Sequence, residues 1–109
     1  MAVTIRVLAQ AFPTATVETA LYTCATTSAV ISTLAICNTS VGSPDNFTIR
    51  VCVAGAGDSN EQLLFNSASI PAGTMLPVTI GITLANTDVI KVTSANGTCA
   101  FSAFGQENS

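Results

Sequence analysis

Residues 77–99 read "PVTIGITLANTDVIKVTSANGTC", and their pattern decides the class of fold. In residues 77–84 every second side chain is aliphatic, and threonine or glycine occupies the positions between them, as is typical of a half-buried β-strand. "ANTD" then predicts a hairpin that leads into a second strand over residues 88–93. Asn96-Gly97 predicts another hairpin, because both central residues of a type I′ turn need a positive φ. The stretch therefore predicts antiparallel β-structure.

Short alternating segments of this kind recur through most of the chain, and turn sequences rich in glycine, proline, asparagine and aspartate separate them. Neither helix-period segments nor an internal repeat is evident. About seven or eight short strands at this spacing predict an all-β fold, an antiparallel β-sandwich or jelly-roll-like domain over residues 21–109. The strands are expected near residues 20–24, 29–37, 46–54, 61–66, 77–84, 88–93 and 98–104.

Residues 1–20 have a different character. Apolar and polar residues alternate over residues 3–7, and Pro13 with its neighbouring threonines then favours extended chain over helix. We expect residues 1–20 to form an extended N-terminal arm or strand that contacts neighbouring subunits. The residues predicted to make these contacts are Val3, Ile5, Val7 and Phe12.

Two features of the predicted strands also point to subunit contacts. Residues 29–37, "AVISTLAIC", are apolar on both faces, so we expect the arm or a neighbouring subunit to cover the outer face, and Ile31 is a predicted contact. Arg50 and Lys91 lie opposite the apolar faces of their strands. They fit either a solvated edge that resists aggregation or an ion pair across a subunit contact.

The chain carries few charges. Only 8% of the residues are charged and the formal net charge is −3, whereas about a quarter of the residues in a typical soluble domain are charged. The shortage predicts that other protein covers much of the surface; a soluble domain coated with threonine and serine is the alternative. The three basic residues are far apart in the sequence, so we expect no nucleic-acid partner and no membrane partner. The first ten residues lack the pattern of a signal peptide, which predicts a protein made in the cytoplasm.

The types of residue present speak against catalysis. The chain contains no histidine, which excludes Ser–His and Cys–His nucleophiles and histidine-containing metal sites. Asp45, Asp58 and Asp88 lie in turn sequences, where we expect their carboxylates to accept hydrogen bonds from backbone amides. We therefore predict no enzymatic activity, no cofactor and no metal.

The four cysteines, Cys24, Cys37, Cys52 and Cys99, lack the paired spacing of a zinc site, and a reactive catalytic thiol is the least expected of their roles. If the strands that contain Cys37 and Cys52 formed a hairpin, these two residues would lie roughly opposite each other, on the face away from the core. Two interpretations stay open: packing as small apolar side chains, and disulfides formed within or between subunits in an oxidising exterior. We expect packing within a single chain and bridging of at least one pair in an assembled particle.

Seven short motifs follow one another along the chain: "LYT" (21–23), "AVIS" (29–32), "CNTS" (37–40), "NFTIRV" (46–51), "SIPAGT" (69–74), "GITLANTDVIKV" (81–92) and "AFSAFGQE" (100–107). Their order resembles a group of small all-β virion structural proteins of tailed bacteriophages, and the resemblance covers roughly residues 1–107. The chain departs from that pattern at residues 24–27, where Cys-Ala-Thr-Thr replaces a turn like Val-Pro-Ala-Gly, and it is richer in cysteine. This departure favours disulfide cross-links in the assembled particle.

The resemblance implies a non-enzymatic component of the virion exterior that is present in many copies. Its position stays open between capsid decoration, head fibre, neck or collar, and tail or baseplate. The implied partners are copies of the chain itself, in a homo-oligomer, and other virion proteins of the capsid, neck or tail. The implied location is the virion, after synthesis in the cytoplasm of a bacterial host. The alternative function is a receptor- or glycan-binding module of a tail or head fibre, although the chain offers only one tyrosine and five phenylalanines to stack on sugars.

Overall fold

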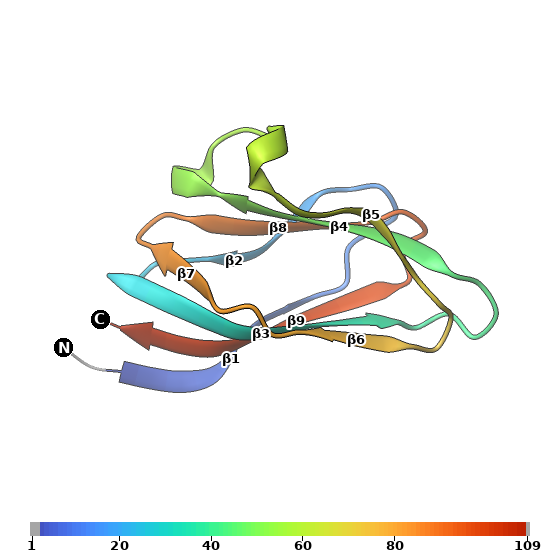
Figure 1. Cartoon of the computed structure of the whole chain (residues 1–109), viewed down its shortest axis with the longest axis horizontal. Coiled ribbons are helices and arrows are strands. Elements are labelled where there is room, and N and C mark those ends of the chain that lie inside the picture. The colour runs from blue at the N-terminus through green and yellow to red at the C-terminus, as the bar shows by residue number, and fades with distance from the viewer. Residues whose placement is uncertain (1–2, 109) are drawn as a thin grey trace.

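Two antiparallel β-sheets pack face to face in the computed structural model, which describes residues 3–108 (Figure 1). Sheet A has the strand order β1-β9-β3-β6, with β7 also paired to β3, and sheet B has the order β2-β8-β4-β5. The strands are β1 (Val3–Ala11), β2 (Thr19–Thr23), β3 (Ser28–Asn38), β4 (Asp45–Cys52), β5 (Leu63–Ile70), β6 (Met75–Val78), β7 (Ile82–Ala85), β8 (Val89–Ser94) and β9 (Cys99–Asn108). Two short 3₁₀ helices, η1 (Val53–Gly55) and η2 (Asn60–Gln62), connect β4 to β5. The predicted all-β sandwich is confirmed, and because most consecutive strands lie in different sheets, its arrangement is jelly-roll-like.

The two hairpins predicted from the sequence, at residues 85–88 and at Asn96-Gly97, are wrong, and the strands around residues 29–37 and 46–54 do not form a hairpin either. The structure places β3 in sheet A and β4 in sheet B, and the chain also changes sheet between β7 and β8 and between β8 and β9. Gly97 has a φ of 75°, but Asn96 does not have the positive φ that a type I′ turn requires. Alternation along a strand reveals that one face is buried, but it does not reveal which strand lies alongside. That choice depends on contacts between distant segments.

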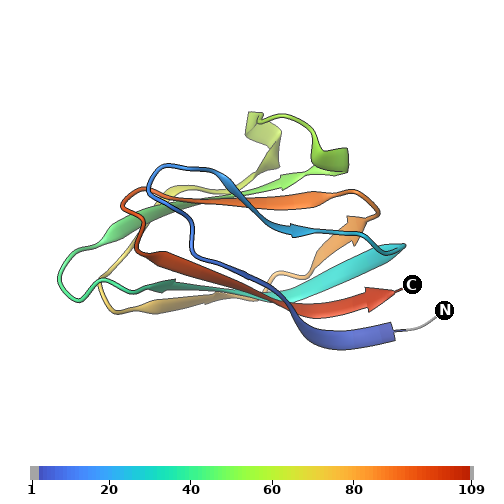
Figure 2. The same cartoon turned by 180° about the vertical axis from the view of Figure 1, so that it is seen from behind.

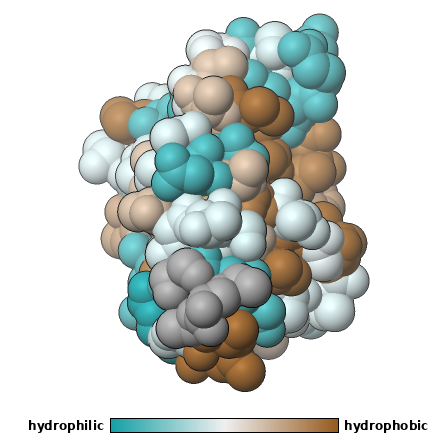
Figure 3. Space-filling view, turned by 90° about the vertical axis from the view of Figure 1, so that its left-hand side faces the viewer, coloured by the Kyte–Doolittle hydropathy of each residue, from teal (hydrophilic) through white to brown (hydrophobic). Residues whose placement is uncertain are grey.

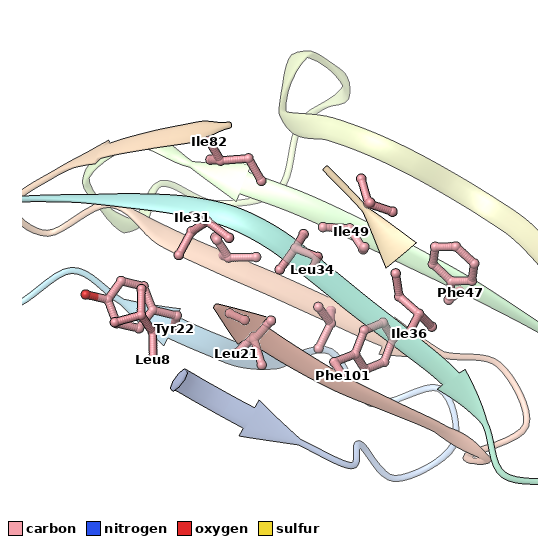
Figure 4. Packing of buried hydrophobic residues seen from close by; sticks show 14 of the residues in the cluster. Leu8, Leu21, Tyr22, Ile31, Leu34, Ile36, Phe47, Ile49, Ile82 and Phe101 are labelled. Carbon is pink, nitrogen blue, oxygen red and sulfur yellow. The ribbon is translucent and has the colours of Figure 1, made fainter. Parts of the chain in front are cut away.

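The core lies between the two sheets, and both contribute to it. Figure 4 shows Ile31, Leu34 and Ile36 of β3 in the layer between the sheets, close to Phe47 and Ile49 of β4. These five side chains are at most 2% exposed. Burial of an aliphatic or aromatic side chain of this size contributes roughly 1.5–3 kcal/mol, so this layer supplies the main driving force for folding.

A β-bulge explains why residues 29–37 are apolar on both faces. The pairing of β3 with β9 shifts between Ile31 and Thr33, so the side chains that point to the core change from odd to even numbers at Ser32. Ile31 before the bulge and Leu34 after it are therefore both buried. Val30, Ala35 and Cys37 still point outward and are half-buried, so coverage of this outer face by a neighbouring subunit stays a prediction.

The strand predicted at residues 77–84 is interrupted at the same level of sheet A. It forms two shorter strands, β6 and β7, and Gly81 between them has a φ of 62°. Strand β6 pairs with β3 beyond the bulge, and β7 pairs with β3 before it. Figure 1 shows β7 directed away from β6, toward sheet B. Within residues 3–108, no helix has the length and apolar character needed to cross a membrane.

Candidate interaction surface

The outer face of sheet A carries no charged side chain on its strands. The pairing registers and the alternation of buried residues identify the side chains that point away from the core. They are Val3, Ile5, Val7 and Gln10 of β1; Ala100, Ser102, Phe104, Gln106 and Asn108 of β9; Ser28, Val30, Thr33, Ala35 and Cys37 of β3; Met75 and Pro77 of β6; and Thr83 and Ala85 of β7. We call this surface the uncharged face.

Large apolar side chains on the uncharged face gather on β1. Val3, Ile5 and Val7 are 55%, 79% and 47% exposed, and Phe12, directly after the strand, is 60% exposed. Figure 3 shows hydrophobic residues at the lower end of the molecule beside the grey terminal residues, the end at which β1 lies in Figure 1. Ile31, which was predicted to contact another subunit, is 1% exposed and belongs to the core, so that prediction is wrong. Val3, Ile5, Val7 and Phe12 are thus accessible to a partner, whereas Ile31 is not.

Strand β1 is an edge strand of the sandwich. It pairs with β9 on one side only, from Val3 opposite Asn108 to Ala11 opposite Phe101. Residues 3–11 of the expected arm are therefore part of sheet A, and the segment that follows them rises to sheet B, as Figure 2 shows. The role of this segment in subunit contacts stays a prediction. The free edge of β1 leaves backbone donors and acceptors available for another strand.

The charged residues of the strands gather on the opposite side of the molecule. Arg50 of β4 and Lys91 of β8 lie directly opposite each other on the outer face of sheet B. Both contact the same two carboxylates. Nε of Arg50 lies 3.4 Å from Glu18 and 3.8 Å from Asp58, and Nζ of Lys91 lies 3.4 Å from Asp58 and 3.9 Å from Glu18. Because β4 and β8 are the central strands of sheet B, these cations lie at no edge, and their ion pairs are made within the chain. This arrangement is neither the solvated sheet edge nor the ion pair across a subunit contact that the sequence suggested.

This charge cluster (Glu18, Arg50, Asp58 and Lys91) covers Cys52. The Cys52 side chain points outward from sheet B, as predicted, yet it is fully buried because the segment with η1 and η2 folds over it (Figure 1). Burial raises the pKa of the Cys52 thiol. Burial, and then the neighbouring Asp58 carboxylate, raise the pKa of Glu18 as well. The cluster therefore fixes a segment of the chain over a neutral thiol.

All four cysteines are free thiols in the structure. Cys24 and Cys99 are fully buried in the core, and burial together with the nearby Asp45 carboxylate raises the pKa of Cys99 to about 12. Cys37 is half-buried and lies on the uncharged face, opposite Ala100. Because Cys37 and Cys52 lie in different sheets, they do not face each other, and the hairpin that would have paired them is absent. Cys37 is the cysteine that a second molecule can reach.

Asp45 is a buried carboxylate with several hydrogen-bond donors around it. It accepts hydrogen bonds from the backbone N–H groups of Asn46 (2.7 Å) and Asn96 (2.8 Å) and from the hydroxyls of Ser94 and Thr98. Burial alone would raise the pKa of Asp45, but these hydrogen bonds outweigh it and lower the pKa to about 2. Sequence analysis predicted this capping role, and the structure confirms it here. The carboxylate holds the crossing from β8 to β9 against the start of β4.

The two other aspartates from turn sequences differ from each other. Asp88 accepts hydrogen bonds from the backbone N–H groups of Ala54 and Ala85, both at 2.9 Å, as predicted. Asp58 instead belongs to the charge cluster, where its partners are Arg50 and Lys91. The alternation on β4 and β8 placed both cations on the outer face of the sheet, but their common carboxylates come from other segments and were not foreseen.

A third polar group lies at the end of the sandwich where the described chain begins and ends. Glu107 of β9 accepts hydrogen bonds from Arg6 (2.6 Å) and from the hydroxyl of Tyr22 (2.5 Å). The hydrogen bond from Tyr22 lowers the pKa of Glu107, and the Arg6 guanidinium adds to this effect. Burial and the Glu107 carboxylate raise the pKa of Tyr22. The group compensates the single charge of β1.

A shallow groove of about 340 Å³ lies where β1 ends and β9 begins, on the uncharged face. Its lining combines an amide, a hydroxyl and an exposed aromatic ring with a buried phenylalanine and small apolar side chains. The lining residues are Gln10, Ala11, Phe12, Ala100, Phe101 and Ser102.

Comparisons with known proteins provide little further information. No model of a protein family matches the chain, and neither does any curated protein. One solved structure that matches is described as "Structure of infectious bursal disease virus Gx strain", with a TM-score of 0.43 and 18% sequence identity. The match covers 96% of this chain and 30% of that chain, so this chain spans less than a third of that protein. A likeness of this degree says nothing about function.

Proposed function

We propose that this chain is a structural subunit on the exterior of a virus particle, and that many copies assemble through the uncharged face and strand β1. The observation that carries the proposal is the separation of charge between the two sheets. The charge cluster lies over sheet B, whereas the outward side chains of sheet A are uncharged and include Val3, Ile5 and Val7 in exposed positions. Protein–protein contacts are depleted in charged residues at their centres, and exposed apolar patches mark such contacts.

The polar groups of the chain support a non-enzymatic role. The carboxylates of Asp45 and Asp88 accept hydrogen bonds from backbone amides that organise turns. Arg50 and Lys91 are engaged by carboxylates of the same chain. These groups stabilise the fold, and the proposal assigns the protein no catalytic step.

The proposed kind of particle rests on the order of sequence motifs that resembles the virion proteins of tailed bacteriophages. We assign the subunit to the exterior of such a particle, as capsid decoration, a neck or collar component, or a tail-associated protein. Cryo-electron microscopy of the particle, with the sandwich fitted into the map, discriminates among these positions.

Mass measurement by light scattering and co-purification with particles test the proposal. We expect the isolated chain to form oligomers and to remain bound to washed particles. Cys37→Arg, which places a charge on the uncharged face, should weaken both properties, whereas Val41→Arg should not, because Val41 lies in a loop and is fully exposed. A chain that stays monomeric at all concentrations and is absent from particles would contradict the proposal.

The groove at residues 10–12 favours a second candidate function, binding of a glycan receptor. Sugars bind through stacking on aromatic rings and hydrogen bonds to amides and hydroxyls, and Phe12, Gln10 and Ser102 offer these groups. A glycan array probed with the chain and with Phe12→Ala tests this candidate. Binding that Phe12→Ala removes would support it, and an array without signal would contradict it.

A further inference from the structure

We propose that strand β1 pairs with β1 of a second copy about a two-fold axis at Ile5, so that the two A sheets become one continuous antiparallel sheet. The inference rests on the proposed assembly and names its primary contact. It follows from the regularity of this edge, from the side chains on it and from the position of its single charge.

The other described sheet edges are blunted, and β1 is not. On the far side of sheet A, β6 and β7 have four residues each, and β6 contains Pro77. In sheet B, β2 has five residues with a register shift after Ala20, and β5 has register shifts and a positive φ at Ser67. Short strands, proline and bulges are the devices that prevent pairing at an edge. In β1, by contrast, residues 3–7 pair with residues 104–108 without a shift, and the first irregularity follows Val7.

The side chains of residues 3–7 are complementary to themselves. In "VTIRV", apolar residues flank Ile5 symmetrically. Antiparallel pairing about Ile5 places Ile5 opposite Ile5 of the second copy and Val3 opposite Val7 of the second copy. All three are exposed in the single chain, so the pairing brings six apolar side chains into contact on one face and reduces the apolar area that water reaches. A two-fold contact requires this kind of self-complementary surface.

The charge on β1 selects both the register and the partner. In the Ile5 register, Arg6 lies opposite the neutral Thr4 of the second copy. Thr4 lies opposite Glu107 in its own sheet, so each Arg6 shares a row with Glu107 of the other copy and keeps its own Glu107 at 2.6 Å. A register centred on Arg6 would place two guanidinium groups directly opposite each other, which is unfavourable. The uncharged face then continues across the seam, with no unpaired charge to desolvate.

Exchange of the residue on the two-fold axis tests the inference. Ile5 is 79% exposed, so Ile5→Lys and Ile5→Glu should leave the fold intact, which circular dichroism and thermal unfolding check. Two lysines or two glutamates would face each other in a homodimer, and we expect each variant to dissociate at concentrations about tenfold or more above the wild type in sedimentation velocity. An equimolar mixture of the two should dimerise again, because lysine then faces glutamate. Val53→Lys, at an exposed position of η1 outside sheet A, is the matched control and should dimerise like the wild type.

The outcomes separate this inference from the proposed function. Loss of dimers in each variant and their recovery in the mixture support pairing about Ile5. A wild-type oligomer that persists in both variants would overturn the β1 contact and leave assembly through another surface. Loss in each variant without recovery in the mixture would overturn the Ile5 register. A wild-type chain that is monomeric at all concentrations would overturn the β1 contact, and it would overturn the proposed function as well only if the chain were also absent from particles.

Discussion

A Cβ atom added to Gly105 would lie 1.9 Å from the backbone carbonyl oxygen of Val30. This close approach occurs where the pairing of β3 with β9 shifts after Ile31, and Ser32 is the extra residue of the bulge. The hydroxyl of Ser32 donates a hydrogen bond to the carbonyl oxygen of Phe104 (3.1 Å). The absence of a side chain at residue 105 therefore permits the bulge on which the buried face of β3 depends.

Gly105→Ala should destabilise the fold strongly, by about 3 kcal/mol or more, because backbone atoms of β3 block the new methyl group. Urea unfolding followed by circular dichroism measures the change. Gly42→Ala is the matched control, since no atom lies within 4 Å of a Cβ at that loop position, and its stability should stay close to that of the wild type. Equal unfolding midpoints for the two variants would contradict the proposed role of Gly105.

Asp45→Asn should reduce the free energy of unfolding at neutral pH by about 2 kcal/mol or more, because a buried acceptor of several hydrogen bonds is lost. The pKa of Asp45 is lowered to about 2 in the folded protein, below its ordinary value of 3.8. Its contribution is thus complete above pH 4 and declines as the pH falls from about 4 to about 2, by about 2 kcal/mol in total. Urea unfolding at pH 7, 4 and 2.5 should show the wild type and the variant converging. The exposed Glu61→Gln should change stability little, and a pH-independent difference between wild type and Asp45→Asn would refute the assignment.

Thiol labelling should distinguish Cys37 from the other three cysteines. Cys37 is half-buried, whereas the others are fully buried, and burial raises the pKa of Cys52 and Cys99. Since the thiolate is the reacting form, one thiol per chain should react quickly with a maleimide under native conditions, and four should react in guanidinium. Peptide mapping by mass spectrometry identifies the labelled residue. Rapid labelling of Cys24 in the folded chain would contradict the packing described here.

Any disulfide between folded subunits should use Cys37. Non-reducing gels of mature particles are expected to show a bridged species that a reductant removes. Cys37→Ser should abolish this species, whereas Cys24→Ser should not, because Cys24 lies in the core. A bridged species that persists in Cys37→Ser would show that a buried cysteine becomes accessible during assembly.

Asp58→Asn should loosen the segment over Cys52 with a small effect on global stability, below about 1 kcal/mol, because these ion pairs are partly exposed to solvent. The pKa of Glu18 should fall toward its ordinary value, since the neighbouring Asp58 carboxylate contributes to raising it. The rate at which Cys52 is labelled should increase, and mass spectrometry measures this rate. Glu61→Gln, in the same segment but outside the charge cluster, is the control. Equal labelling of Cys52 in both variants would contradict the proposed role of the cluster.

Much of the fold could be predicted from local pattern. Each strand expected near residues 20–24, 46–54 and 88–93 has a counterpart within a few residues, because alternation and turn residues act over short distances. The break at Gly81 and the bulge at Ser32 were not predicted. The break at Gly81 lies at the level of the bulge in sheet A, and the bulge lies beside Gly105 of β9. The pattern of one strand contains no information about the strands beside it.

The candidate surface was predicted in part. Alternation in a segment with few charges placed Val3, Ile5 and Val7 on one face and predicted them as contact residues, and all three are exposed. Ile31 was misassigned because the bulge changes the face of β3 on which it lies. The pairing of Arg50 with Lys91 was not predicted either, because it depends on the order of strands in sheet B.

The sequence by itself determined the all-β class, the approximate strands and the shortage of charge, because these follow from residue types and their spacing. Only the tertiary structure decided which strands share a sheet, where the registers shift and which faces receive the few charges. The hydrophobic effect requires each strand to bury one face but does not specify its neighbour. Hydrogen bonds such as those of Asp45, and close approaches such as that of Gly105 to Val30, make that choice, and both join residues that are far apart in the chain.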